Sequence, residues 1–401
     1  MDFYLQFGWG MMGMSRDLIR DWNGGTVILS PRDLEPKQLE PFSKSINTIE
    51  NGRVLFDPQF YLPHSDHIRL RSHDYWPSAY STGAFFVGPA LDTLLSKLKH
   101  LNDELDSAAA ILPGLLANEI DGDWLNIQNA ILNAAKKANF SRPLCQTIAL
   151  SADACRSEEQ IVRLLEHSAQ WKSEVYYLVC EHPRGSYLVT DSLWLSNLLD
   201  VIAGLKLLGS KVVVGYSNHQ MLIAAAVKAD AIASGTWMNV RAFPPEKFRE
   251  ALEEEERRKA TWYYCPQGLS EYKLPMLDIA KKVGLLDQLL PVNMPIESAV
   301  ALLFDGGQPS TVGLTEPQAF RHYLNCLKHQ TGVSVKQTFD QTIEEHDRLL
   351  DEAEALLKTL TGSRIKGQLR DFSEAIEVNR STLGALIATR GGVLRRRWST
   401  I

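Results

Sequence analysis

The stretch that decides the fold class is KVVVGYSNHQMLIAAAVKADAIASGTWMNVR, residues 211–241. It opens with the β-branched run Val212–Val214, which ends at Gly215 and leads into an alanine-rich helix. A second apolar run, Asp230–Ser234, ends at Gly235. Short apolar runs of this kind are typical of parallel strands that are buried on both faces. The stretch therefore predicts one β-α-β unit whose functional residues lie at the carboxyl ends of its strands.

The same order of strand, polar turn and helix recurs along the chain. Five further runs have the composition of buried strands: Phe3–Phe7, Thr26–Leu29, Arg53–Phe56, Gln146–Leu150 and Val175–Cys180. This alternation favours a parallel α/β architecture over a sandwich. Thr261–Cys265 or Ala299–Phe304 is expected to supply an eighth strand. We therefore predict a TIM-like (β/α) barrel.

The spacing of apolar residues predicts two helical regions besides the barrel repeat. Residues 88–140 are predicted as a helical insertion, with helical periodicity over Leu91–Leu105, Ala108–Leu116 and Trp124–Ala138. Residues 310–401 are predicted as a helical, partly basic C-terminal domain, which leaves 1–309 for the barrel. The charged run 246–259 has the Glu-to-Lys/Arg spacing of a solvated helix.

The composition bounds the compartment and the cofactors. The chain of 401 residues is 45% hydrophobic and 22% charged with a net charge of −6, as in ordinary globular proteins. No apolar run reaches the roughly 18 residues that cross a bilayer. The five cysteines are dispersed without a CxxC pair, which points to a reducing cytoplasm and argues against a cysteine zinc site. Walker, GxGxxG, GxSxG and HExxH motifs are absent, so we expect no cofactor.

Asp57 is the first candidate for chemistry because it directly follows a predicted buried strand. Barrel enzymes hold their acids, bases and nucleophiles at this position. The alternative is that Asp57 stabilises the Asp-Pro turn through its own hydrogen bonds. Gln59 and Phe60 follow in the same turn and suit a flat heterocycle, the amide pairing with its edge and the ring stacking on its face.

Further strand ends carry charged residues. Glu181 and Asp153 follow two other predicted strands and are candidates for acid–base catalysis, or else for salt bridges to Arg156 or Arg184. Arg32 could hold a phosphate or carboxylate, or simply pair with its neighbour Asp33.

The segment from His64 to Asp74 carries three histidines and two aspartates. Imidazoles and carboxylates this close occur in the metal sites of hydrolases, which gives one alternative function, that of an unrelated barrel hydrolase or lyase. The segment has no strand or helix pattern that would orient the ligands, so we expect a lid over the site and no metal.

The end of the chain is basic. Residues 364–401 hold eight Lys/Arg against three Asp/Glu. Local basic patches, rather than the net charge, determine affinity for phosphates. A nucleic-acid contact through Arg390, Arg395, Arg396 and Arg397 is one hypothesis, and a solvated tail or a contact with a partner subunit or second copy is the other.

Two segments resemble the tRNA-guanine transglycosylases and their DNA-modifying relatives, barrel enzymes that exchange a guanine for a 7-deazaguanine. In VLFDPQFYLP, Asp57 matches the family's strand-ending aspartate before a Gln-bearing turn. In residues 211–241, the family's last β-α-β unit is matched by Gly215, Asp230, Asn239 and Arg241. The resemblance implies that Asp57 recognises the base or handles a proton. Phe60 or Trp237 would stack the base, and Arg32, Arg241 and the basic tail would hold phosphate.

The chain departs from the family at two places. Ala233 stands where the family has its nucleophilic aspartate, and Cys265 is all that remains of the zinc-binding cysteines. Ser234 or Glu181 would replace the nucleophile only in a changed mechanism. Two functions therefore remain beside the hydrolase: a transglycosylase-like enzyme acting on a base, free or in nucleic acid, and a catalytically lapsed barrel that binds nucleic acid or a partner.

Overall fold

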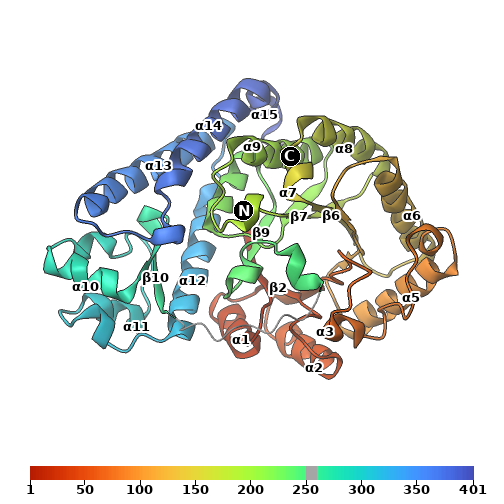
Figure 1. Ribbon diagram of the computed structural model, residues 1–401, viewed down its shortest axis with the longest axis horizontal. Coiled ribbons are helices and arrows are strands. Elements are labelled where there is room, and N and C mark those ends of the chain that lie inside the picture. The colour runs from red at the N-terminus through yellow and green to blue at the C-terminus, as the bar shows by residue number, and fades with distance from the viewer. Residues whose placement is uncertain (250–259) are drawn as a thin grey trace.

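The computed structural model describes residues 1–249 and 260–401 (Figure 1). Among these residues, eight parallel strands form a closed barrel, because β1 pairs with both β2 and β9 and β4 pairs with both β3 and β6. In order around the barrel they are β1 (Asp2–Gln6), β2 (Gly25–Leu29), β3 (Gly52–Phe56), β4 (Ala110–Ile111), β6 (Leu144–Leu150), β7 (Val175–Cys180), β8 (Lys211–Val214) and β9 (Ala231–Ser234). The predicted TIM-like barrel is confirmed.

Helices cover the outside of the barrel. Those that connect successive strands are α1 (Met12–Asp21), α2 (Pro36–Asn47), α5 (Pro89–Glu104), α6 (Gly122–Ala138), α7 (Ala152–Arg156), α8 (Glu158–Trp171) and α9 (Ser192–Leu207). The alanine-rich segment after β8 is a 3₁₀ helix, η2 (His219–Val227), in which every residue is buried. The long helix α12 (Glu316–Ser334) returns from the C-terminal part of the chain and packs against β1 and α1.

The eighth strand is β4, and both sequence-based candidates for it were wrong. Ala110–Ile111 pairs with β3 on one side and β6 on the other, within a segment that was predicted to be helical. Two paired residues are too few to show a strand period, and the alanines before them favour a helix. Thr261–Cys265 instead falls in a separate hairpin, and Ala299–Phe304 is helical.

The region 88–140 holds the expected helices, α5 and α6, and β4 lies between them. These helices are therefore the covering helices of two successive barrel units. The connection from β3 to α5 carries two single-turn helices, α3 (Ile68–Arg71) and α4 (Thr82–Phe85). After β4, the short strand β5 (Leu116–Ala117) pairs with the end of β6.

The C-terminal part combines a β-hairpin with helices. The antiparallel strands β10 (Trp262–Cys265) and β11 (Ser270–Lys273) are followed by α10 (Leu274–Lys282), α11 (Ser298–Ala301), α13 (Phe339–Gly362), α14 (Ser373–Thr389) and α15 (Gly391–Arg397). Figure 1 shows α12 between this hairpin and the barrel, and α12 contacts β10 on one side and β1 on the other. The hairpin is therefore attached to the barrel wall through α12.

Short 3₁₀ helices form many of the connections: η1 (Pro183–Gly185), η3 (Met238–Val240), η4 (Pro245–Phe248), η5 (Pro266–Gly268), η6 (Leu286–Leu289), η7 (Leu302–Phe304), η8 (Pro309–Thr311) and η9 (Gln368–Arg370). Most of the charged run 246–259, predicted as a solvated helix, lies outside the described residues. Within the described ranges, no helix combines the length and apolar character that a bilayer crossing requires.

Candidate active site at the barrel mouth

Asp57 lies at the carboxyl end of β3 and is 1% exposed. Its Oδ1 accepts a hydrogen bond from the backbone N–H of Gln59 at 2.9 Å. Its Oδ2 accepts from the hydroxyls of Tyr61 at 2.7 Å and Tyr216 at 3.2 Å, and the Tyr177 hydroxyl is 3.4 Å away. A carboxylate that follows a buried strand is thus surrounded by donors from three different parts of the barrel.

The donors come from β7 and from the loops that follow β3 and β8. Tyr177 is a β7 residue whose hydroxyl also lies 2.9 Å from Gln6 Oε1 at the end of β1, and its single hydrogen is donated either to this oxygen or to Asp57 Oδ2 at a time. Tyr216 and Gln59 both have left-handed backbone conformations, with φ of 51° and 50°. Such conformations are costly for residues other than glycine and cluster at functional sites.

Gln59 links Asp57 to the end of β2. Its Nε2 donates to Ser30 Oγ at 2.9 Å and to Tyr216 Oη at 3.0 Å, while its Oε1 accepts the backbone N–H of Arg32 at 3.0 Å. Both functions of the amide are therefore used to hold the loops together, so Gln59 positions the surroundings of Asp57.

Burial raises the pKa of Asp57 to about 6, although hydrogen bonds from Tyr61, the Gln59 N–H, Tyr216 and Tyr177 all lower it. Burial and the nearby Asp57 raise the pKa values of Tyr61, Tyr177 and Tyr216 well above the usual range. The tyrosines are therefore neutral donors. A carboxyl with a pKa near neutrality is suited to accept and return a proton.

An aromatic layer covers this polar centre. The ring of Tyr61 packs against Phe243 and Phe248, with centroid distances of 4.9 and 5.0 Å, and Tyr216 contacts Phe243 at 5.2 Å. The Arg32 guanidinium lies 5.0 Å from the centroid of the Phe248 ring. The layer excludes water from Asp57, which explains why its pKa is raised.

Two buried side chains around Asp57 have a polar atom without a partner among the described residues. These are Arg32, through Nη1, and Gln6, whose amide has one partner, the Tyr177 hydroxyl, so that its other amide atom is unpaired. Arg32 Nη2 contacts Asp33 at 3.2 Å, so this arginine both pairs with its neighbour and retains a free nitrogen. Unpaired buried polar groups are costly, so these two side chains mark a place where a water, an ion or a ligand atom would be stabilised.

The other candidate carboxylates lie at strand ends but not in this cluster. Glu181 follows β7 and is half-buried, and its Oε2 accepts the backbone N–H of Ala152 at 3.1 Å. Asp153 is exposed in the first turn of α7. Arg156 pairs with Asp191 rather than with either of them.

The predicted substrate-binding residues are spread over several places. Phe60 is buried among Trp76, Tyr80 and Phe85. Trp237 donates to the backbone carbonyl of Trp9 and packs against Phe320.

Three further candidate residues belong to the β-α-β unit of residues 211–241, and they do not lie together. Gly215 follows β8 beside Tyr177, and Asn239 lies in η3, where its Oδ1 is buried without a partner among the described residues. Asp230 lies at the opposite, amino end of β9, where it accepts from Lys206 and from the Val212 N–H.

Ala233 and Ser234, the residues at and next to the position of the family's nucleophilic aspartate, lie on opposite faces of β9. Ser234 is paired in register with Leu5, one residue before Gln6, whose side chain points into the barrel and contacts Tyr177. Because neighbouring residues of a strand point to opposite faces, Ser234 lies on the outer face, beside Tyr323 of α12. Ala233 occupies the inner face and offers no nucleophile.

Arg241 belongs to a second buried centre built around Glu271 of β11. Glu271 accepts hydrogen bonds from Tyr187 at 2.7 Å, Arg370 at 2.8 Å and Arg241 at 3.2 Å. The two arginines outweigh burial and lower the pKa of Glu271. The Arg241 guanidinium also lies 3.5 Å from the centroid of the Tyr323 ring. Arg241 therefore joins the barrel to the C-terminal hairpin.

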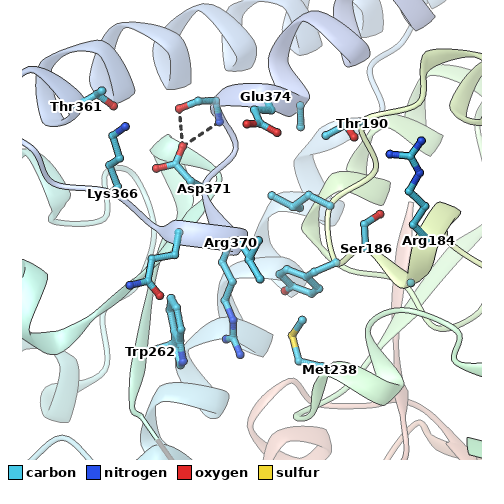
Figure 2. A pocket seen from close by; sticks show the side chains of 17 residues that line it. Arg184, Ser186, Thr190, Met238, Trp262, Thr361, Lys366, Arg370, Asp371 and Glu374 are labelled. Carbon is cyan, nitrogen blue, oxygen red and sulfur yellow. Dashed lines mark hydrogen bonds between the residues drawn. The ribbon is translucent and has the colours of Figure 1, made fainter.

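A cleft of about 830 Å³ opens beside this centre, between the β7–α9 loop, the hairpin and the α13–α14 connection (Figure 2). Figure 2 shows Arg370 next to Trp262, with Arg184 and Lys366 on opposite sides of the cleft. The Arg370 guanidinium is 4.2 Å from the centroid of a Trp262 ring. Arg184 and Lys366 have no carboxylate partner among the described residues.

The histidine segment is engaged in packing and backbone contacts. His73 is buried, and its Nε2 lies 2.9 Å from the carbonyl oxygen of Pro31 and 3.1 Å from that of Leu34. Asp66 pairs with Arg71, and Asp74 with Lys97. Across residues 1–249 and 260–401, no three His, Cys, Asp or Glu side chains gather as a metal site would require.

Three of the four tail arginines have partners within the chain. Arg390 pairs with Asp200, Arg395 pairs with Asp340, and Arg397 donates to the carbonyl of Leu207. Arg396 is exposed. The tail is thus a folded helix, and the nucleic-acid contact stays a prediction.

Sequence reasoning missed the three tyrosines around Asp57, and it missed Gln6 and Glu271. Tyr177 lies inside an apolar strand, where an aromatic residue is typical of any core. Gln6 gave the one usable signal, because it is a polar residue within a buried strand.

No protein-family model and no curated protein matches the chain. Among solved structures, a GH10 xylanase of Thermobacillus composti is similar at 10% identity and a TM-score of 0.38, over 62% of this chain and 89% of that one. FabK from Thermotoga maritima is similar at 12% identity and a TM-score of 0.31, over 90% and 94%. Similarity at this level carries no inference about function.

Proposed function

We propose that the chain is a transglycosylase-like enzyme that acts on a guanine-type base, with Asp57 as the carboxyl that holds the base and handles the proton. The observation that carries the proposal is the combination at the barrel mouth of a buried carboxyl, Asp57, with two buried side chains that each keep an unpaired polar atom, the amide of Gln6 and Nη1 of Arg32. Arg32 Nη1 requires an acceptor on the ligand, and a donor on the same edge would share Asp57 with Gln59, Tyr61 and Tyr216.

A guanine has this pattern. Its ring N–H and exocyclic amino group would donate to Asp57, and its carbonyl oxygen would accept from Gln6 or Arg32. The rings of Tyr61 and Phe243 would provide apolar faces for the heterocycle. The water-excluding layer would strengthen each of these interactions.

The cleft beside Glu271 would receive the remainder of the substrate. Arg184 and Lys366 on its walls would face phosphate oxygens, and Trp262 would offer a stacking surface. Arg241, which the resemblance assigns to phosphate, would act here indirectly by holding Glu271 and so the hairpin.

A second candidate function is a base-binding barrel without catalysis. It is favoured by Ala233 on the inner face of β9 and by the outward position of Ser234, since neither can attack a sugar carbon. For either function we propose a reducing, cytoplasmic location, which the five buried and unpaired cysteines support.

The experiment that tests the proposal measures incorporation of radiolabelled guanine into tRNA and into double-stranded DNA, alongside calorimetric titration with guanine. The enzyme proposal requires incorporation that is lost in Asp57→Asn and kept in Asp17→Asn, a change at an exposed carboxylate on α1. Binding of guanine without incorporation would favour the second candidate. If guanine neither binds nor is incorporated, both are wrong.

A further inference from the structure

Another cavity lies outside the barrel wall, between α12, α13 and the loop 288–294. Its volume is about 730 Å³, which is within the range of small-molecule sites. Apolar side chains form much of its wall: Leu222, Val292, Met294, Val333, Leu349 and Leu356. Val292 and Val333 are 60% and 45% exposed, so the cavity has an open, apolar mouth.

Gln267, in the turn of the β10–β11 hairpin, lines this cavity. Its Nε2 donates to the carbonyls of Gln288 at 2.8 Å and Leu290 at 2.9 Å. Two carbonyl oxygens can only accept, so the orientation of the amide is determined and Oε1 must be the atom on the other side. This Oε1 is buried and has no partner among the described residues. A group that satisfies it must be a donor.

His346 of α13 lines the same cavity, and this residue is only 5% exposed. Its Nε2 also has no partner within the described part of the chain. Burial lowers the pKa of His346 to about 4, so the ring is neutral at pH 7 and can donate or accept at Nε2 according to its tautomer.

The charged residues at the rim are paired with one another. Glu345 contacts Arg348 at 2.8 Å and Lys336 at 3.5 Å, and Arg348 also contacts Glu352. The ionic groups at this rim are therefore already compensated, and a charged ligand would gain little here. An apolar body with one neutral donor group complements what the cavity offers.

We propose that this cavity is a binding site for an apolar small molecule that presents a neutral hydroxyl or N–H group to Gln267 Oε1. The apolar body would lie between α12 and α13, and His346 would meet a second polar atom of the same ligand. This site shares no residue with the Asp57 centre or the Glu271 cleft, so it does not depend on the proposed function.

The test compares phenol with anisole, its methyl ether, which has the same ring but no donor. Ligand-detected NMR titrations of the intact protein should give about tenfold tighter binding for phenol, the effect of one hydrogen bond to a buried acceptor that otherwise has none. In Gln267→Leu the two affinities should differ by less than about twofold. Val333→Trp should weaken both compounds, because the indole fills the mouth.

Val162→Trp, at an exposed position on α8 away from the cavity, is the matched control and should bind both compounds as the unchanged protein does. The comparison of phenol with anisole needs no variant, so misfolding of Gln267→Leu would not remove the test. Equal affinities, binding that survives Val333→Trp, or no binding of either compound would each overturn the proposal. In the last case the cavity holds water only.

Discussion

Gly215 and Tyr177 are in direct contact across the β7–β8 pair: a Cβ atom at Gly215 would lie 2.5 Å from the Tyr177 hydroxyl oxygen. No side chain other than hydrogen fits at this distance without moving the tyrosine. Because that hydroxyl also reaches Gln6 and Asp57, the glycine after β8 controls the geometry of the acid at the end of β3.

Gly215→Ala should therefore disturb the Asp57 centre. We expect a loss of about 1–3 kcal/mol in the free energy of unfolding, as for other overpacked cores, and weaker binding of any ligand held by Asp57. Urea unfolding measures the first effect. Gly384→Ala is the control, since nothing lies within 4 Å of a Cβ there and a helical alanine should be neutral or stabilising. Equal behaviour of the two variants would contradict the contact.

Asp57→Asn should change how stability depends on pH. The pKa of Asp57 rises from 3.8 in the unfolded chain to about 6 in the folded one. The folded state thus binds a proton more tightly, and the stability this provides is present below pH 3.8 and lost as the pH rises through about 6. Asparagine does not ionise and so does not lose stability in this way. The free energy of unfolding of Asp57→Asn, relative to that of wild type, should therefore increase by about 3 kcal/mol as the pH rises from 3.5 to 7.5.

Chemical unfolding at these two pH values measures that difference. Asp17→Asn should show no such change relative to wild type. If the difference in the free energy of unfolding between Asp57→Asn and wild type is the same at both pH values, burial does not destabilise the ionised carboxylate of Asp57.

Glu271→Ala should be among the most destabilising single changes. It would leave the buried Arg241 and the largely buried Arg370 without their carboxylate, at a cost of about 3–5 kcal/mol. Because the pKa of Glu271 is lowered, its contribution is present above the usual carboxyl range and is lost as the pH falls through the lowered pKa. Glu40→Ala, which removes an exposed pair with Lys44, should cost less than about 1 kcal/mol.

Trp398→Ala should loosen the attachment of the last helix. Trp398 is buried, its ring lies 5.7 Å from Phe339, and its Nε1 donates to the Lys336 carbonyl at 3.2 Å. Truncation of a buried tryptophan costs about 3 kcal/mol or more. Thermal unfolding would measure the loss. An unchanged melting temperature would mean that the tail is a solvated segment.

The nucleic-acid hypothesis for the tail is tested by a salt titration. If Arg390, Arg395, Arg396 and Arg397 contact phosphates, each arginine-to-alanine change should flatten the log–log salt dependence by about one unit. Fluorescence anisotropy with RNA and DNA duplexes measures this slope. Arg396→Ala is the most direct variant, because this exposed side chain has no ion pair within the described residues. An unchanged slope would assign the tail to packing alone.

The sequence by itself determined the fold class and the position of the acid. Seven strands could be located because buried parallel strands leave short apolar runs that end in polar turns, and this pattern depends on near neighbours in the chain. The same local logic located Asp57 at a strand end. It failed at β4, where only Ala110 and Ile111 pair and the flanking residues favour a helix.

The tertiary structure alone decided what surrounds each candidate residue. Tyr177 and Tyr216 reach Asp57 across 120 and 159 residues of chain, because closure of the barrel brings β7 next to the ends of β3 and β8. The tertiary structure also brings Arg241 into contact with Glu271. It gives three of the tail arginines partners elsewhere in the chain. Such partners follow from which elements become neighbours in space, and the periodicity of a single strand or helix does not encode that choice.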